Sequence, residues 1–260
     1  MRRLWLAALT LIASGLLAAP VFAGNGMPTF KRGATLVEFF EFPKTTGHDD
    51  LRSYADPAFP DPLAALDLFD FDTLRRIGFD HMRVPLDVGP LMQADDATQQ
   101  KILGQLVAVV SAINRHGLNV LVTLFPPSLQ HELPQTYLDG LDGPRFTAYA
   151  AVVDRVSTAL SSIDPGAVAL EPMNEPQSQC RVYFATDWIA YQQAMGARIR
   201  RISARLPLFL TGGCWSNIEG IVTLDTDLLP IAGASSPRNC RRARLLNVHA
   251  ARHVQTFWYG

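Results

Sequence analysis

Residues 118–125, LNVLVTLF, decide how this chain of 260 residues folds. The run is nearly continuously apolar, which is typical of a strand in a parallel sheet that is covered on both faces. A stretch with apolar residues at helical spacing, 97–116, precedes it, and Pro126-Pro127 ends it. The segment therefore predicts one helix-to-strand step of an α/β fold.

Strands alternate with helices along the rest of the chain. The predicted strands are 32–40, 79–84, 118–125, 167–173, 208–211 and 245–249. The predicted helices are 69–77, 97–116, 145–162, 188–206 and a short one at 218–224. Strict alternation favours parallel strands joined by helical crossovers, an order that doubly wound sheets and barrels share.

The turns after the strands favour the barrel. A doubly wound nucleotide-binding sheet carries a glycine-rich phosphate turn after its first strand, whereas Gly33 stands alone there and no GxGxxG or P-loop motif occurs. Polar and aromatic residues instead follow several strand ends, where a barrel builds its active site. We therefore expect an α/β fold of the (β/α)8 TIM-barrel type, with about six of the eight βα units in this chain.

Composition and charge exclude several classes of protein. Hydrophobic residues make up 48% and charged residues 18% of the chain, which excludes an intrinsically disordered protein. Lys and Arg (23) nearly cancel Asp and Glu (24), so no charge excess points to nucleic acid or to an anionic membrane. The three cysteines form no CxxC or Cys/His cluster, and we expect neither a metal site nor a cofactor.

Residues 1–23 have the pattern of a secretory signal peptide: a basic start, an apolar stretch over 4–19 and small residues before the cleavage point. An uncleaved membrane anchor is the alternative, since the stretch nearly reaches the ~18–20 residues needed to span a bilayer. We expect residues 24–260 to form one incomplete barrel domain that is secreted or periplasmic, monomeric and free of the membrane after cleavage. Export permits a disulfide, which we expect between Cys180 and Cys214.

The residues with the clearest chemistry end the strand at 167–173. The sequence MNEP at 173–176 follows an apolar run, so Glu175 lies at the carboxyl mouth of a strand, where a carboxylic acid can protonate a leaving group. Asn174 beside it can hydrogen-bond a substrate hydroxyl or hold the carboxylate. A helix cap or a turn is the alternative, because Asn, Glu and Pro are all common in loops.

The segment ALEPMNEP at 169–176 resembles the fourth-strand signature of glycoside hydrolase family 5, the cellulase-type (β/α)8 barrels. Its Glu171 is interpreted as a barrel-interior partner for a basic group. GFDHMRVP at 78–85 is similar to the second-strand motif of that family, and HGLNV at 116–120 is similar to the entry to its third strand. Three shorter matches keep the family's order: Arg32-Gly33, Gly212-Gly213 with Trp215, and Asn247-Val248-His249.

The resemblance implies a retaining O-glycosyl hydrolase of polysaccharide catabolism that acts on a β-linked polysaccharide or glycoside, such as a glucan or mannan. Glu175 would be the general acid/base, and Asn174 would contact the 2-hydroxyl of the sugar. Arg83 would orient a catalytic carboxylate, Trp215 would stack on a sugar ring, and His249 would line the site near the nucleophile. The alternatives are a structural ion pair for Arg83, helix packing for Trp215 and a satisfied, buried position for His249.

The chain departs from the family in residues that would complete the site. The family's nucleophile is a Glu at the end of the seventh strand, and this sequence has no acidic residue after Asp227. The family's third strand usually ends in Asp-x-His and its sixth reads His-x-Tyr, where this chain has TLF at 123–125 and HAA at 249–251. We therefore expect these 260 residues to hydrolyse glycosides very slowly or not at all, unless Glu38 or Glu41 projects into the cleft.

Two other functions are compatible with the sequence. A noncatalytic carbohydrate-binding remnant of such an enzyme would keep the aromatic cleft without the second carboxylate. A barrel that cleaves esters or amides has less support, because no GxSxG or HExxH motif occurs.

Overall fold

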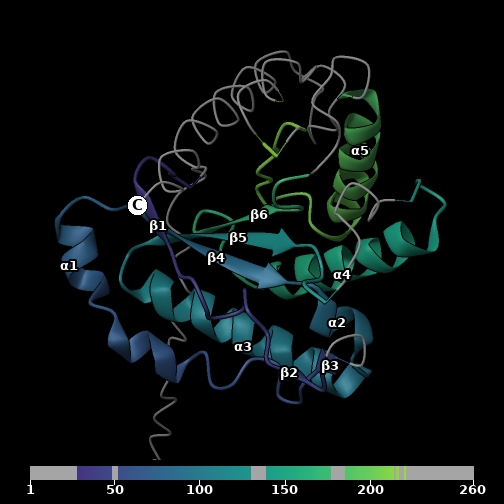
Figure 1. The fold of residues 1–260 in the computed structure, drawn as a ribbon. Coiled ribbons are helices and arrows are strands. Elements are labelled where there is room, and N and C mark those ends of the chain that lie inside the picture. Colours follow the sequence, from purple (N-terminus) through teal and green to yellow (C-terminus); the bar gives the residue numbers. More distant parts are fainter. Residues whose placement is uncertain are drawn as a thin grey trace, which may run out of the picture.

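The computed structural model describes residues 28–48, 52–129, 139–176, 185–213, 215, 216 and 220. Its centre is a four-stranded parallel sheet in the order β1-β4-β5-β6 (Figure 1). The strands are β1 (Gly33–Thr35), β4 (His81–Asp87), β5 (Asn119–Phe125) and β6 (Val168–Glu171). Leu208 extends the sheet by a parallel bridge to Leu170, so the predicted strand at 208–211 lies in its expected place but is reduced to one bridge.

Helices connect consecutive strands, as the sequence predicts for parallel crossovers. They are the 3-10 helix η2 (Ala64–Leu68), α1 (Phe71–Arg76), α2 (Gly89–Gln93), α3 (Asp96–Arg115), α4 (Pro144–Leu160) and α5 (Ala185–Ile202). A small antiparallel hairpin of β2 (Thr45–Thr46) and β3 (Ser53–Tyr54) stands outside the predicted elements. In the part of the chain that the structure describes, no helix combines the length and the apolar character needed to cross a membrane.

The predicted first strand, 32–40, is interrupted in the structure. β1 ends at Thr35, and Glu38 has a φ of 74°, which lies outside the strand region. The chain then rejoins β4 at Phe40, which forms a parallel bridge with Leu86. The segment after β1 therefore still runs along β4 to the carboxyl end of the sheet.

The helix-facing side of the sheet forms the main core. Alternate residues of β4 and β5 are fully buried there, namely Val84, Leu86, Val120, Val122 and Leu124. They belong to one cluster with apolar residues of α3 and α4, including Leu106, Val110, Ile113, Val153 and Val156. Each such side chain stabilises the fold by about 1.5–3 kcal/mol relative to an exposed position. This face accounts for the alternate apolar positions Val120, Val122 and Leu124 of the strand predicted at 118–125.

The other side of the sheet is the interior of the barrel. A separate apolar cluster fills it, made of Phe30, Leu121, Ala169 and Phe209. Thr123 and Glu171, the next inward-pointing positions of β5 and β6, are polar and buried, as is Arg83 on β4. The interior therefore changes from apolar to polar toward the carboxyl ends of the strands.

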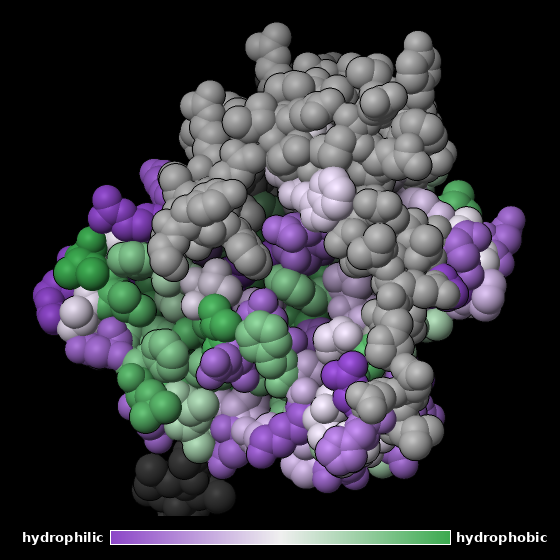
Figure 2. All heavy atoms as spheres, viewed as in Figure 1, coloured by the Kyte–Doolittle hydropathy of each residue, from purple (hydrophilic) through white to green (hydrophobic). Residues whose placement is uncertain are grey.

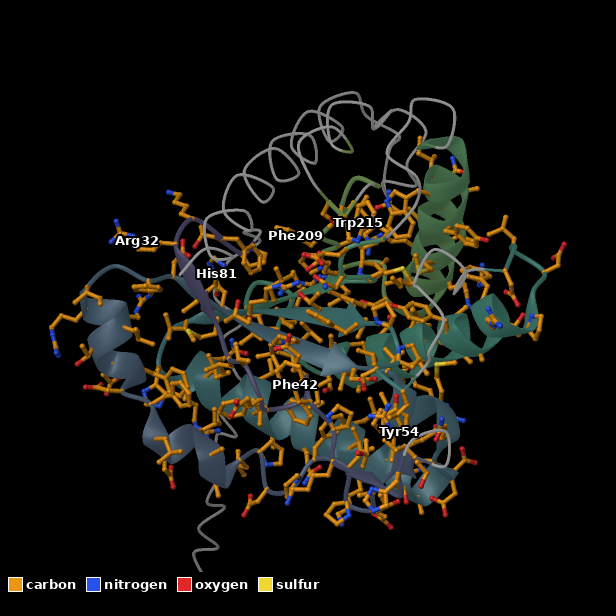
Figure 3. The ribbon with its side chains drawn as sticks, in the orientation of Figure 1. Arg32, Phe42, Tyr54, His81, Phe209 and Trp215 are labelled. Atoms are coloured by element: carbon orange, nitrogen blue, oxygen red, sulfur yellow. The ribbon has the colours of Figure 1, made fainter. Side chains whose placement is uncertain are left out.

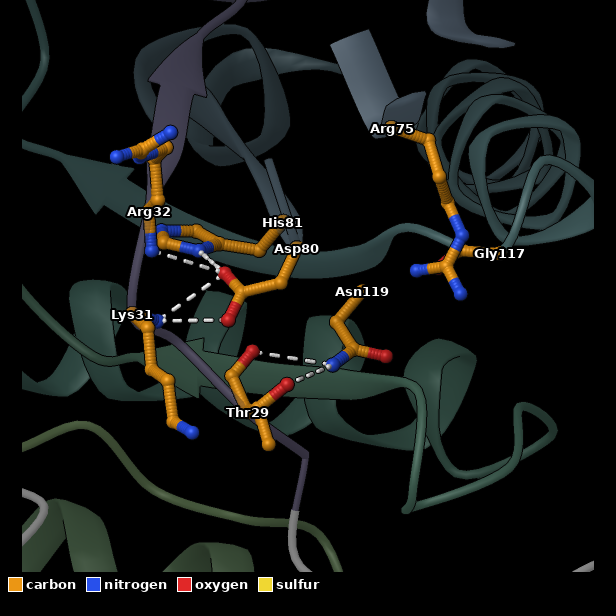
Figure 4. A network of polar contacts seen from close by, with 8 residues as sticks. All are labelled: Thr29, Lys31, Arg32, Arg75, Asp80, His81, Gly117 and Asn119. Carbon is orange, nitrogen blue, oxygen red and sulfur yellow. Dashed lines mark hydrogen bonds and ion pairs between the residues drawn. The ribbon is translucent and has the colours of Figure 1, made fainter. Parts of the chain in front are cut away.

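A polar network closes the amino-terminal end of the sheet, here called the floor (Figure 4). Asp80 accepts hydrogen bonds from the backbone N–H of Lys31 at 2.9 Å and of Arg32 at 3.1 Å, and its Oδ1 lies 2.7 Å from Nδ1 of His81. Burial acts to raise the pKa of Asp80, but the hydrogen bonds from His81, Arg32 and Lys31 outweigh it and lower the pKa. Asn119 donates to the backbone oxygen of Thr29 at 3.1 Å.

Exposed apolar side chains gather around α1, on the left of the view in Figure 2. They are Leu63, Leu68, Phe69 and Ile77. This surface adjoins β1, which pairs with β4 alone within the described ranges.

Candidate active site

Arg83 on β4 is the centre of the polar layer at the carboxyl end of the sheet. Its Nη2 donates to Oδ1 of Asn174 at 2.6 Å and lies 3.4 Å from Oε2 of Glu171. A guanidinium has only donors, so Asn174 must turn its carbonyl oxygen toward Arg83. The amide NH2 of Asn174 is therefore left to donate to another group.

Glu171 lies below this cluster, inside the barrel, and is 2% exposed. Thr123 of β5 donates its hydroxyl to Oε2 of Glu171 at 2.7 Å, and the same oxygen faces Arg83. The Cζ of Arg83 lies 5.4 Å from the centre of the Phe125 ring, close enough for a cation–π contact. The guanidinium is thus held on one edge by Glu171 and on one face by Phe125, as expected for a barrel-interior ion pair.

Glu175 follows β6 and is half-buried. Its φ of 41° is a left-handed conformation that costs a residue other than glycine on the order of 1 kcal/mol. Burial raises the pKa of Glu175, the positive charge of Arg83 offsets part of that rise, and the negative charge of Glu171 adds to it. A carboxyl group with a raised pKa stays protonated to higher pH, which is the property that a general acid needs.

Trp215 lies beside the turn that carries Glu175. Its backbone N–H donates to the backbone oxygen of Pro176 at 3.1 Å, and the residue is 41% exposed. Figure 3 shows Trp215 beyond β6 on the α5 side, and Phe42 beside the end of β4. The two exposed aromatic residues therefore stand at different edges of the same end of the sheet.

The structure brings Arg83, Asn174 and Glu175 into one cluster, and Trp215 is tied to the same turn through the backbone. His249 lies outside the described residues, and the catalytic and binding roles of all five stay predictions. The predicted signal peptide at 1–23, the pair Cys180 and Cys214 and the predicted strand at 245–249 also lie outside. So does the predicted short helix at 218–224, apart from Gly220, which is helical. The described residues contain no group of three or more His, Cys, Asp or Glu side chains that could hold a metal ion.

Sequence reasoning did not assign a role to Phe125 or decide between Glu38 and Glu41. Phe125 could have been found, because it occupies the place of the usual histidine in the third-strand pattern. Glu38 is exposed, whereas the pKa of Glu41 is raised by burial and lowered in part by the charge of Arg83. Glu41 therefore lies in the electrostatic field of Arg83.

A family model described as Cellulase (glycosyl hydrolase family 5) matches residues 69–249. The match contains Arg83, Asn174, Glu175, Trp215 and His249. No curated protein matches the sequence.

Several solved structures share the fold. An endoglucanase matches with a TM-score of 0.54 at 13% identity, over 75% of this chain and 55% of its own. Thermotoga maritima Cel5A matches with a TM-score of 0.53 in its complex with cellobiose (17% identity) and 0.53 in its complex with mannotriose (16% identity), with the same shares of 75% and 55%. The described strands and helices are part of a (β/α)8 TIM barrel, and the chain spans about half the length of these structures.

Proposed function

Because the chain belongs to glycosyl hydrolase family 5, the cellulase family, we propose that it acts as a retaining O-glycosyl hydrolase on a β-linked glucan. The observation that carries the proposal is the half-buried Glu175 with its raised pKa, next to an Asn174 whose carbonyl is fixed by Arg83. This arrangement supplies a proton donor and a hydroxyl-binding amide side by side.

Glu175 serves as the general acid/base in this proposal. In the first step its proton passes to the glycosidic oxygen as the bond to the anomeric carbon breaks, and the carboxylate is left ionised. In the second step that carboxylate takes a proton from the attacking water. Asn174 donates its free NH2 to the 2-hydroxyl of the reacting sugar, and Arg83 keeps the amide in that orientation.

A retaining mechanism also needs a second carboxylate about 5–5.5 Å from the first. Glu171 is engaged by Thr123 and Arg83, and Glu38 is exposed, so neither is suited to attack the anomeric carbon. Glu175 therefore supplies the acid/base half of the pair, and of the carboxylates considered from the sequence Glu41 is left as the candidate for the second half. We expect the 260 residues by themselves to bind the substrate and to cleave it very slowly or not at all.

The substrate proposed first is a β-linked glucan, with a mannan as the second choice. One similar structure is an endoglucanase, and Thermotoga maritima Cel5A is described in complex with cellobiose and with mannotriose. Trp215, exposed beside the acid, supplies an aromatic ring on which a sugar can stack. The proposal includes one barrel domain at 24–260, secreted or periplasmic after loss of residues 1–23, that acts as a monomer.

Formate tests the chemistry in the absence of an enzyme nucleophile. Formate adds to the anomeric carbon of an aryl β-cellobioside from the face opposite the leaving group, the aryl oxygen departs with the proton of Glu175, and water hydrolyses the resulting ester. We expect formate-dependent release of phenol from phenyl β-cellobioside, and Glu175→Gln should lower that rate by about 10²–10⁴-fold. The variant should lose far less with a 2,4-dinitrophenyl leaving group, which departs without a proton.

Glu38→Gln is the matched control, because it removes an exposed carboxylate from the same end of the sheet. Equal rates for Glu175→Gln and the unchanged chain with both leaving groups would refute Glu175 as the acid. Tight binding of cellotetraose in calorimetry, with no formate-dependent turnover, would favour the noncatalytic carbohydrate-binding function instead.

A further inference from the structure

The segment that follows α5 runs beside β6 and is then held by side chains of α5. The N–H of Phe209 still donates to the backbone oxygen of Leu170 in β6, at 2.8 Å. At Thr211 both backbone groups are bonded to the helix instead. The indole Nε1 of Trp188 donates to the oxygen of Thr211 at 2.7 Å, and the N–H of Thr211 donates to Oε1 of Gln192 at 3.2 Å. Two side chains of α5 therefore fix the end of this segment.

The two side chains belong to a firmly packed face of α5. Trp188 and Gln192 are four residues apart, so they lie on one side of the helix, and each is 2% exposed. Trp188 packs in the main core together with Met195 and Ile199 of the same helix. The Nε2 of Gln192 is buried and has no hydrogen-bond partner among the described residues. A buried amide nitrogen without a partner costs stability, so packing alone does not account for a glutamine at this position.

The backbone held at Thr211 leads directly to Trp215. Trp215 stands four residues further on, and its N–H donates to the oxygen of Pro176 at 3.1 Å, next to Glu175 (Figure 3). The φ of Trp215 is 55°, a left-handed conformation that persists in a residue other than glycine only where the surrounding structure holds it. The exposed ring of Trp215 is therefore mounted between two anchors, one on α5 and one on the turn that carries Glu175.

We propose that Trp188 and Gln192 are positioning residues for oligosaccharide binding: through Thr211 they fix the place of the Trp215 ring relative to Glu175. The inference rests on the proposed function, because Trp215 is the ring on which a sugar stacks there. A stacking ring helps catalysis only if it lies against the sugar in the same complex in which the acid reaches the glycosidic oxygen. A ring that is already fixed also loses less conformational freedom when the sugar binds, which raises the affinity.

A double-mutant cycle on cellotetraose binding, measured by calorimetric titration of the full chain, tests this route. Gln192→Met keeps the size of the side chain but removes the acceptor of Thr211, and should weaken binding by about 3- to 10-fold. Trp215→Ala should weaken it by about 10- to 100-fold. In the Trp215→Ala background, Gln192→Met should change the affinity by less than about twofold, because its effect passes through the ring. Trp188→Phe, which removes the indole N–H, should show the same dependence on Trp215.

Gln99→Met is the matched control. Gln99 in α3 is also buried, donates its Nε2 to the backbone oxygen of Ala94 at 2.8 Å and has no partner for its Oε1 among the described residues. Gln99→Met should lower the thermal midpoint about as much as Gln192→Met and leave cellotetraose binding unchanged. Amide hydrogen exchange at Trp215 should accelerate in Gln192→Met and not in Gln99→Met, which reports on the anchoring without a ligand.

Two results would overturn the inference: unchanged cellotetraose binding by Gln192→Met, or an equal loss from Gln192→Met with and without the Trp215 ring. Neither result affects the formate-dependent turnover that depends on Glu175, so the proposed function would stand. If the unchanged chain does not bind cellotetraose, the binding step of the proposed function fails and the positioning role of Trp188 and Gln192 fails with it.

Discussion

An aspartate stands at each end of β4, and the pKa values of the two are shifted in opposite directions. At the floor, Asp80 is bonded to two backbone N–H groups and to His81, and its pKa is lowered. At the mouth, the carboxyl end of the sheet, Asp87 is 1% exposed, and burial raises its pKa to about 6 even though it accepts from the N–H groups of Gly89 and Ser128. The carboxylate just before β4 therefore favours ionisation, whereas the carboxylate of its last residue resists ionisation.

Backbone strain follows the same division. Among the residues that the structure describes, five other than glycine have positive φ, and four of them come after strands at the mouth: Glu38, Glu175, Trp215 and Ser216. Buried polar atoms without a hydrogen-bond partner among the described residues occur at both ends. Oε2 of Glu41 and Nε of Arg83 belong to the mouth, but the floor has one as well: Oδ1 of Asn114, whose amide donates to the backbone oxygens of Leu118 and Ala167. Barrels build activity at the carboxyl ends of the strands and stability at the amino ends. The distribution of backbone strain indicates that the mouth is the end shaped for function, whereas the floor contributes stability.

The largest expected effect on stability comes from the floor. A Cβ on Gly33 would lie 2.1 Å from Nε2 of His81, whose ring is bonded to Asp80 and packed edge-on against Phe30. Gly33→Ala therefore forces the ring out of its place, and we expect the free energy of unfolding to fall by about 3 kcal/mol or more in urea titrations. The fraction that remains folded should bind cellotetraose as before.

Gly104→Ala is the matched control, because nothing lies within 4 Å of a Cβ at Gly104 in α3. That variant should gain about 0.5–1 kcal/mol from helix propensity. If Gly33→Ala lowers the free energy of unfolding by less than about 1 kcal/mol, the floor rearranges at little cost. The contrast in stability between the two ends would then not hold.

The pH dependence of stability should have opposite signs at the two ends. An unfolded Asp titrates near pH 4, and folded Asp87 holds its proton to about pH 6, so the unfolded state binds fewer protons between these values. The contribution of Asp87 to stability is therefore present below about pH 4 and is lost, by on the order of 2 kcal/mol, as the pH rises through about 6. Asp80, with a lowered pKa, contributes above about pH 4 and loses its contribution as the pH falls.

Urea unfolding of Asp87→Asn and Asp80→Asn from about pH 3 to about pH 7, each compared with the unchanged chain, measures the contribution of each aspartate to stability. Subtraction from the unchanged chain removes the contributions of the other carboxyl groups. Slopes that change in the same direction for both variants would contradict the assignment.

Pattern and position together predict the sheet and the cluster at its mouth. Periodicity predicts the strands at 79–84, 118–125 and 167–173, and the carboxyl ends of parallel strands must meet, which brings Arg83 and Glu175 together. The hairpin of β2 and β3 leaves no such signal, because its strands have two residues each and are mostly exposed. The left-handed turn at Glu38 and the unpaired oxygen of Glu41 depend on tertiary packing, which a local pattern does not contain.

The smallest expected effect compares one hydrogen bond from each end. At the mouth, the hydroxyl of Tyr54 accepts from the N–H of Leu129 at 3.2 Å, and burial together with the charge of Asp87 raises the pKa of Tyr54 to about 12. Tyr54→Phe leaves that N–H without its acceptor and should cost about 1 kcal/mol. At the floor, Asn119→Ala removes the bond to the exposed backbone of Thr29, where water can replace it, and should cost about 0.5 kcal/mol.

Amide hydrogen exchange is the measurement that distinguishes Tyr54→Phe from Asn119→Ala. Exchange at Leu129 should accelerate in Tyr54→Phe, while the amides of Lys31 and Arg32, which donate to Asp80, should keep their protection because the main core lies between the two ends. Asn119→Ala should leave Leu129 unchanged for the same reason. If Tyr54→Phe also released the Lys31 and Arg32 amides, the mouth and the floor would open as one cooperative unit. Stability could then not be assigned to one end and ligand binding to the other, so this last and weakest substitution tests the premise on which the stronger ones depend.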